Sequence, residues 1–94
     1  MATPEKLLEE VSDFESFIAF LNALIEDRAD AEKLEAKEPA RWAYGGAQGW
    51  QNADISAFME CGMQYFVRHK EEMKTRQPSW KDIAEFLYFG KIYE

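Results

Sequence analysis

The stretch SDFESFIAFLNALIED, residues 12–27, decides the fold class of this 94-residue chain. Large apolar side chains recur in it at intervals of three and four residues, so they lie along one side of an α-helix. Ser12 and Glu15 have the spacing of a capping box, in which two side chains bind free amides at a helix start. The pattern predicts a helix beginning near Ser12 and burying the stripe Phe14, Phe17, Ile18, Leu21, Leu24 and Ile25.

The flanking segments also predict helices. Thr3 and Pro4 are typical of a short helix start, because proline at the first helical position loses no hydrogen bond. The charged segment 29–39, ADAEKLEAKEP, is either a short solvated helix or a continuation of the preceding one, and its proline ends it. The predicted fold is therefore all-α from its first residues onward.

Two further helices are expected in the second half of the chain. One starts with Asn52 as its N-cap and places Ile55, Phe58, Met59, Gly62, Phe66 and His69 on one face. The other starts at the Ser79 and Asp82 capping box, ends near Gly90, and turns Trp80, Ile83, Ala84 and Leu87 inward. We predict one helical domain over residues 1–94: a small bundle of three to four helices with a Gly/aromatic loop at about 40–51.

The charge of the chain is one-sided. Residues 1–40 hold eleven acidic and four basic side chains, whereas residues 41–94 hold seven of each, so the net charge of −7 belongs to the first part. Excess acid disfavours nucleic acid and anionic membranes and favours basic partners, although it also serves solubility alone. With no basic, apolar leader, no membrane-length segment and one cysteine, the sequence predicts a cytoplasmic protein.

Catalytic and metal-binding patterns are weak in this sequence. His69 is the single histidine and Cys61 the single cysteine, and their spacing does not suit metal binding on one helix. The glycines of GGAQG lack the lysine and hydroxyl of a phosphate loop. We therefore predict no catalytic residue, no metal, no cofactor and no enzymatic activity.

The stretch RWAYGGAQGWQN, residues 41–52, allows two interpretations. Trp42, Tyr44 and Trp50 are residue types that dominate protein interfaces, and they surround three glycines. Alternatively, Trp50 fills the helical core and the loop is only a connection. We expect Trp50 in the core and leave open whether Trp42 and Tyr44 are exposed.

Three segments together resemble a family of small uncharacterised bacterial all-helical proteins. They are VSDFESFIAFLNALIED at 11–27, WQNADISAFMECG at 50–62 and PSWKDIAEFLYFGKIYE at 78–94. The shared features are a capped Phe-rich first helix, Trp-x-Asn, Pro-Ser-Trp and a terminal Tyr-Glu. Some small acidic proteins of this type act as immunity proteins beside toxins, and the resemblance implies the same association here.

These observations lead to two functional hypotheses. The first is an immunity protein that inhibits a contact-dependent or polymorphic toxin, a basic nuclease domain, by occluding its active site. Its partner-binding residues would be Glu26, Asp27, Asp30, Glu32, Glu35, Trp42 and Tyr44. The alternative is a structural or regulatory interaction module, as a homodimer that uses the aromatic residues Tyr88, Phe89 and Tyr93.

Overall fold

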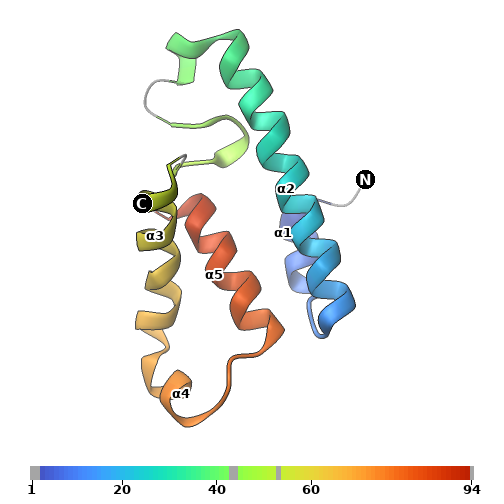
Figure 1. Cartoon of the computed structure of the whole chain (residues 1–94), viewed down its shortest axis with the longest axis vertical. Coiled ribbons are helices and arrows are strands. Elements are labelled where there is room, and N and C mark those ends of the chain that lie inside the picture. The colour runs from blue at the N-terminus through green and yellow to red at the C-terminus, as the bar shows by residue number, and fades with distance from the viewer. Residues whose placement is uncertain (1–2, 43–44, 53, 94) are drawn as a thin grey trace.

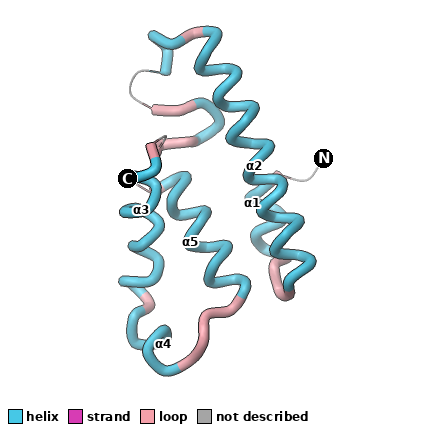
Figure 2. Tube along the Cα trace, in the orientation of Figure 1, coloured by secondary structure: helices cyan, strands magenta, loops and turns pink. Residues whose placement is uncertain are grey.

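The computed structural model describes residues 3–42, 45–52 and 54–93, and every regular element in these ranges is helical. Figure 2 shows the helices and the connecting loops along the chain. The all-α prediction is confirmed. The described ranges contain three long and two short α-helices, whereas the sequence predicted three to four helices. The elements are α1 (Pro4–Glu9), α2 (Phe14–Lys37), the 3-10 turns η1 (Pro39–Trp42) and η2 (Ala47–Gly49), α3 (Ile55–Arg68), α4 (Lys70–Thr75) and α5 (Trp80–Ile92).

Helix α2 runs for 24 residues, so the charged segment 29–39 continues the Phe-rich helix. The predicted capping box of Ser12 and Glu15 is wrong by one residue. Asp13 Oδ1 accepts the Ser16 amide at 2.9 Å, and Ser16 Oγ accepts the Asp13 amide at 3.0 Å. The ionised cap also interacts favourably with the positive end of the helix, and these hydrogen bonds lower the pKa of Asp13.

Helix α3 starts later than predicted, because Asp54 and not Asn52 is its N-cap. The Asp54 carboxylate accepts the Ala57 amide at 2.8 Å. Asn52 instead donates its side-chain amide to the carbonyl oxygens of Gly90 and Tyr93, at 3.0 and 2.6 Å. Asn52 therefore joins the loop before α3 to the end of α5.

Helix α5 begins with the predicted Ser79 and Asp82 capping box and ends at Ile92. The prediction that Gly90 ends the helix is wrong, since Gly90 lies inside it and is buried. A Cβ atom at Gly90 would lie 2.7 Å from the Phe58 ring, a distance that real Cβ atoms do not reach. Glycine is required here for the close packing of α3 against α5, and not for a turn.

The helices form a flat molecule of 46 × 28 × 16 Å. Helix α5 lies between α3 and α2, and α1 packs against α2 and contacts α5 (Figure 1). The core lies where α1, α2, α5 and the Gly/aromatic loop meet, around Phe20, Leu24, Trp50 and Ala84. Trp50 is 4% exposed, which confirms its predicted place in the core. No helix in the described ranges is long and apolar enough to cross a bilayer.

Candidate functional site

A pocket of about 500 Å³ lies between α1 and α2, and Gln48 and Lys91 contribute to its lining. We call it the acidic pocket. Four carboxylates and one ammonium group line it, so its lining has a net charge of −3. The charged residues are Glu5, Glu26, Asp27, Asp30 and Lys91.

Lys91 is the buried basic residue of the acidic pocket, and its side chain is 2% exposed. Its Nζ atom lies 2.8 Å from Asp27 Oδ2 and 3.1 Å from Glu5 Oε1. Burial alone would lower the pKa of Lys91, but the hydrogen bonds with the two carboxylates outweigh burial and raise it. The ammonium also lies 5.5 Å from the centre of the Trp50 ring. Lys91 is therefore a charged cross-link between α5, α2 and α1.

Asp27 holds the Gly/aromatic loop as well as Lys91. Its carboxylate accepts the Trp50 indole N–H at 2.8 Å and the Gln48 side-chain amide at 2.9 Å. The Asp27 side chain is only 16% exposed. The Asp27 carboxylate is therefore used in internal contacts, and it also lines the acidic pocket.

Glu35 holds the same loop at Ala47, the residue before Gln48. Its carboxylate accepts the Ala47 amide at 3.0 Å and forms a bidentate pair with Arg28, with N–O distances of 3.0 and 3.1 Å. The Arg28 guanidinium lies 5.3 Å from the Trp50 ring centre. Any side chain at Gly46 would collide with the Trp50 carbonyl oxygen and with Glu35. Gly46 therefore lets the loop fold tightly onto α2.

The structure separates the predicted partner-binding residues into groups. Glu26, Asp30 and Glu32 are exposed on α2, whereas Asp27 and Glu35 bind the loop. Trp42 is partly buried against the core, with the Arg41 guanidinium 5.0 Å from its ring centre. Tyr44 lies outside the described residues.

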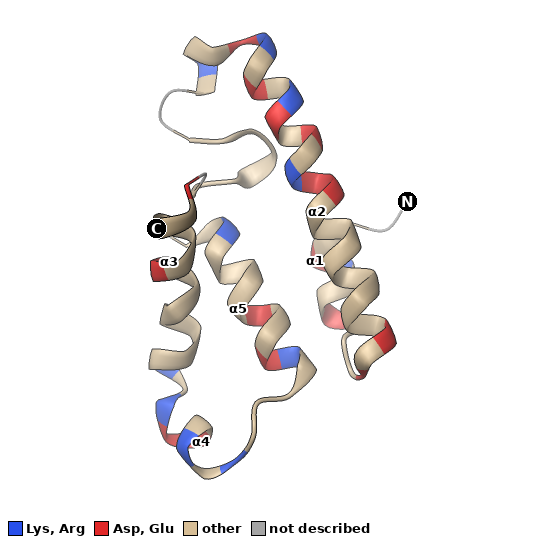
Figure 3. Cartoon of the chain, viewed as in Figure 1, with Lys and Arg blue, Asp and Glu red and all other residues tan. Residues whose placement is uncertain are grey.

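The charges on α2 are mixed in its second half, where lysine and arginine alternate with acidic residues (Figure 3). Glu26 and Asp30 are one helical turn apart and both line the acidic pocket. Glu32 lies 3.9 Å from Arg28, which partly offsets its charge. Within residues 26–37, the carboxylates that form no ion pair with a described basic residue are therefore Glu26 and Asp30, both at the acidic pocket.

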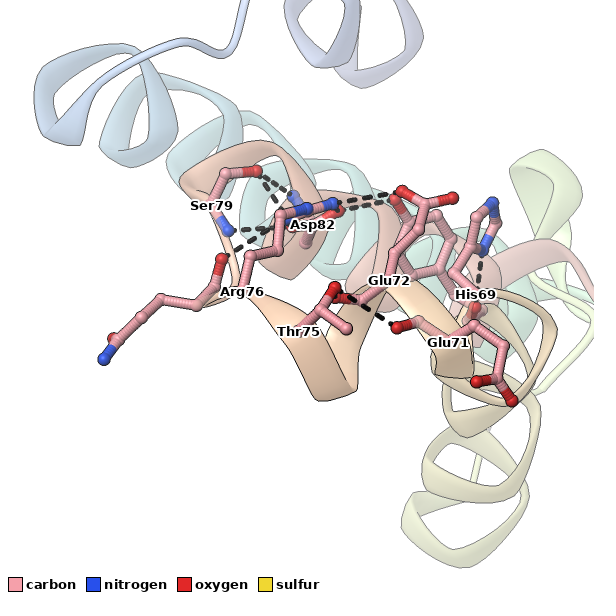
Figure 4. A network of polar contacts seen from close by, with 9 residues as sticks. His69, Glu71, Glu72, Thr75, Arg76, Ser79 and Asp82 are labelled. Atoms are coloured by element: carbon pink, nitrogen blue, oxygen red, sulfur yellow. Dashed lines mark hydrogen bonds and ion pairs between the residues drawn. The ribbon is translucent and has the colours of Figure 1, made fainter.

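A second polar cluster holds the corner between α4 and α5 (Figure 4). Asp82 is buried and accepts hydrogen bonds from Arg76 at 2.7 Å, the Tyr65 hydroxyl at 2.7 Å and the Ser79 amide at 2.8 Å. The Arg76 hydrogen bond is the main cause that holds the pKa of Asp82 far below its usual range. Burial and donation to Asp82 raise the pKa of Tyr65. These donors are all used to stabilise the fold.

His69 lies beside this cluster, at the junction of α3 and α4. Its Nδ1 atom is 2.7 Å from the Tyr65 carbonyl oxygen, so Nδ1 carries the proton of this hydrogen bond. The imidazole also packs on the Tyr65 ring, with 4.4 Å between ring centres. Across the described parts of the chain, no three His, Cys, Asp or Glu side chains gather in a way that could hold a metal ion.

Sequence reasoning missed Lys91 and Glu5 as parts of the site. Lys91 binds Asp27 across 64 positions of the chain, and no local pattern carries information about such a contact. One signal was available in the sequence. Lys91 lies one helical turn after Leu87, on the inward face of α5, and a buried charge needs a partner of opposite charge.

A protein-family model, described as a family of unknown function (DUF7660), matches residues 13–94, and the chain belongs to this family. The match includes α2, α3 and α5 and leaves out α1. Neither curated proteins nor solved structures gave a match. The description of the family names no role, so a role for this chain rests on the residues of the site.

Proposed function

We propose that this DUF7660 member is an immunity-type protein of bacterial origin, a cytoplasmic inhibitor that binds a basic toxin domain in a one-to-one complex. The single observation that carries the proposal is the gathering of four carboxylates around one pocket that has one basic residue. The target class is a nuclease domain, because its nucleic-acid-binding surface must be basic. Covering that surface would block the active site without any reaction on the inhibitor.

The exposed carboxylates are placed to pair with basic side chains of the partner. Glu26 and Asp30 stay solvated in the free protein and lie one turn apart, so neighbouring lysine or arginine side chains can pair with both. Paired charges that are desolvated on docking also exclude partners that lack the matching basic groups. Glu32 extends the same helix surface and would contact the rim of the partner.

The internal contacts hold this surface in a fixed shape before binding. Lys91 and Asp27 fix α1 and α5 to α2, and Glu35 fixes the Gly/aromatic loop. A surface that is already ordered loses less conformational entropy on binding. Asp27 and Glu35, two of the residues predicted to touch the partner, then act as positioning residues. Trp42, the predicted aromatic contact, is partly buried against the core and would present only its exposed part to the partner.

The experiment is affinity capture from cells of the source organism, followed by inhibition. Wild-type protein and the double variant Glu26→Lys/Asp30→Lys are immobilised and compared at low and high salt. The control variant Glu60→Lys/Glu71→Lys carries the same charge change at exposed carboxylates of α3 and α4 that form no ion pair among the described residues. The captured protein is then tested for nuclease activity against increasing amounts of inhibitor.

The proposal expects a basic protein that wild type and control retain at low salt and that the α2 variant loses. Its nuclease activity should fall in proportion to added inhibitor and end at one chain per toxin domain. Capture of no basic protein at low salt, or equal capture by the α2 variant, would contradict the proposal.

A further inference from the structure

A second hollow of about 520 Å³ lies between α2 and the start of α3, and we call it the apolar groove. Its lining includes Leu24, Trp50, Phe58 and Leu87, which belong to the hydrophobic core or pack on it. The Trp50 and Phe58 rings stack with 6.3 Å between their centres. The volume lies within the roughly 300 to 1,000 Å³ that binding sites occupy. The groove therefore has an ordered, apolar floor.

Two exposed isoleucines line the apolar groove, one from each helix. Ile25 of α2 is 58% exposed and Ile55 of α3 is 77% exposed. The sequence predicted Ile25 in the buried stripe of α2, and this is wrong. Apolar side chains that face water beside an apolar hollow, with polar residues around them, mark a surface that a partner covers.

The charges at the apolar groove select a basic occupant. Arg28, Glu32 and Asp54 are its charged lining residues, and the Arg28 guanidinium already forms a bidentate pair with Glu35. Glu32 is 65% exposed, and the exposed Asp54 forms no ion pair among the described residues. Free carboxylates repel an anionic ligand and attract lysine or arginine side chains. The groove therefore fits an apolar group that carries basic neighbours.

Helix α2 lies between the apolar groove and the acidic pocket. Ile25 and Ala29 line the groove, whereas their neighbours Glu26 and Asp30 line the acidic pocket, and all four are exposed. One partner of a standard interface contributes roughly 800 Å², a patch roughly 30 Å across, whereas a helix with its side chains is roughly 10 Å wide. A protein that docks on Glu26 and Asp30 therefore reaches across α2 to the groove.

The aromatic residues at the end of the chain offer less free surface. Phe89 packs against Tyr65 of α3, with 5.5 Å between ring centres, and also against Tyr93. Tyr88 is half-buried beside the core. These rings are used inside the chain, so the apolar groove is the better candidate for contact with a partner.

We propose that the apolar groove binds an amphipathic helix of the basic partner. Apolar side chains of that helix would enter the groove between Ile25 and Ile55, as in other helix-in-groove complexes. Its lysine or arginine side chains would pair with Glu32 and Asp54. The inference rests on the proposed function, because the occupant belongs to the same partner, and it adds the apolar half of that interface.

The first test uses a defined probe, a helical peptide with a leucine stripe and lysine at its other positions. It is titrated into isotopically labelled protein and followed by NMR. The amide signals of Ile25 and Ile55 and the Trp50 indole signal should shift. Two matched peptides, with glutamine in place of leucine or glutamate in place of lysine, should each bind at least about tenfold more weakly.

Matched variants locate the binding surface. Ile25→Ser/Ile55→Ser should weaken binding of the leucine–lysine peptide roughly tenfold or more. Met63→Ser/Val67→Ser is the control, since it removes two exposed apolar side chains of α3 that line no part of the groove. Circular dichroism checks that both variants are helical. No binding of this peptide, equal binding of the glutamate peptide, shifts confined to the acidic pocket, or equal binding by Ile25→Ser/Ile55→Ser would overturn the inference.

The second test separates this inference from the proposed function. Ile25→Ser/Ile55→Ser should dissociate from the captured basic protein roughly tenfold faster than wild type, with little change in the association rate, because apolar contacts act mainly on dissociation. A captured protein that dissociates equally from both would overturn the groove and leave the proposed function standing. Capture of no basic protein would instead contradict the proposed function, while the peptide titration still decides whether the groove binds a basic amphipathic helix.

Discussion

Replacing Lys91 by methionine would remove the ammonium that joins α5 to α2 and α1 while keeping the buried stem of the side chain. The main interaction lost would be the ion pair with Asp27, whose Oδ2 atom lies 2.8 Å from Nζ. The lysine side chain is 2% exposed and the aspartate side chain 16% exposed. The contact with Glu5 adds little, because Glu5 is 48% exposed and its charge is screened by water.

The size of the effect follows from these two contacts. Breaking a fully buried pair costs about 3 to 5 kcal/mol, and an exposed pair contributes at most about 1 kcal/mol. Asp27 keeps two other donors, Trp50 and Gln48, after the substitution. We therefore expect Lys91→Met to lower the free energy of unfolding by about 2 to 3 kcal/mol. For a domain of this size that lowers Tm by roughly 10 to 20 °C.

The assay is urea and thermal unfolding followed by circular dichroism, with exposed Lys33→Met as the matched control. The pKa of Lys91 is raised in the folded protein, so its contribution is complete below the unfolded lysine pKa of about 10.4 and is lost as pH rises above it. The difference between wild type and Lys91→Met should then be constant near neutral pH and shrink only in strong alkali. A Lys91→Met variant as stable as Lys33→Met would refute this reasoning.

Three further substitutions test other parts of the structure. Gly90→Ala should lower the free energy of unfolding by about 1 to 3 kcal/mol in urea titrations, because its Cβ would overlap the Phe58 ring, whereas an open helix position would gain about 1 kcal/mol. Asp82→Asn weakens the contact with Arg76 and should cost about 2 kcal/mol at neutral pH. Since the folded pKa of Asp82 is lowered, wild type should lose this advantage as pH falls below about 4, and unfolding measured from pH 7 to pH 2 checks it. Glu35→Gln should increase hydrogen exchange of the loop amides with little change in α3 and α5, and uniform exchange across the chain would contradict that role.

The sequence predicted the elements whose causes are local. Apolar spacing predicted α2, α3 and α5, and the Ser79 and Asp82 capping box predicted the start of α5 correctly. The sequence was misleading where two neighbouring capping boxes are possible. The box formed by Asp13 and Ser16 is the one observed, and not the predicted box that starts at Ser12. The role of Gly90 was predicted wrongly, because the requirement for glycine there comes from the Phe58 ring on another helix.

The candidate site was less accessible to sequence reasoning. The acidic bias of the first 40 residues pointed to α2, and Glu26 and Asp30 are exposed there at one pocket. Which carboxylates remain available depends on contacts across the chain, such as Lys91 with Asp27. The sequence grouped Ile55 and Met59 with Phe58 and Gly62 on one face of α3, yet Ile55 and Met59 are exposed. Periodicity shows that a helix has an apolar side and not which neighbour covers it.

The most direct measurement of the central claim is the association rate of wild type and Glu26→Lys/Asp30→Lys with the captured basic protein across a series of salt concentrations. If the acidic pocket and its exposed carboxylates guide docking, the wild-type rate should fall steeply with added salt. The variant should associate at least about tenfold more slowly at low salt and respond weakly to it. Equal rates for the two proteins at every salt concentration would show that docking does not use this face.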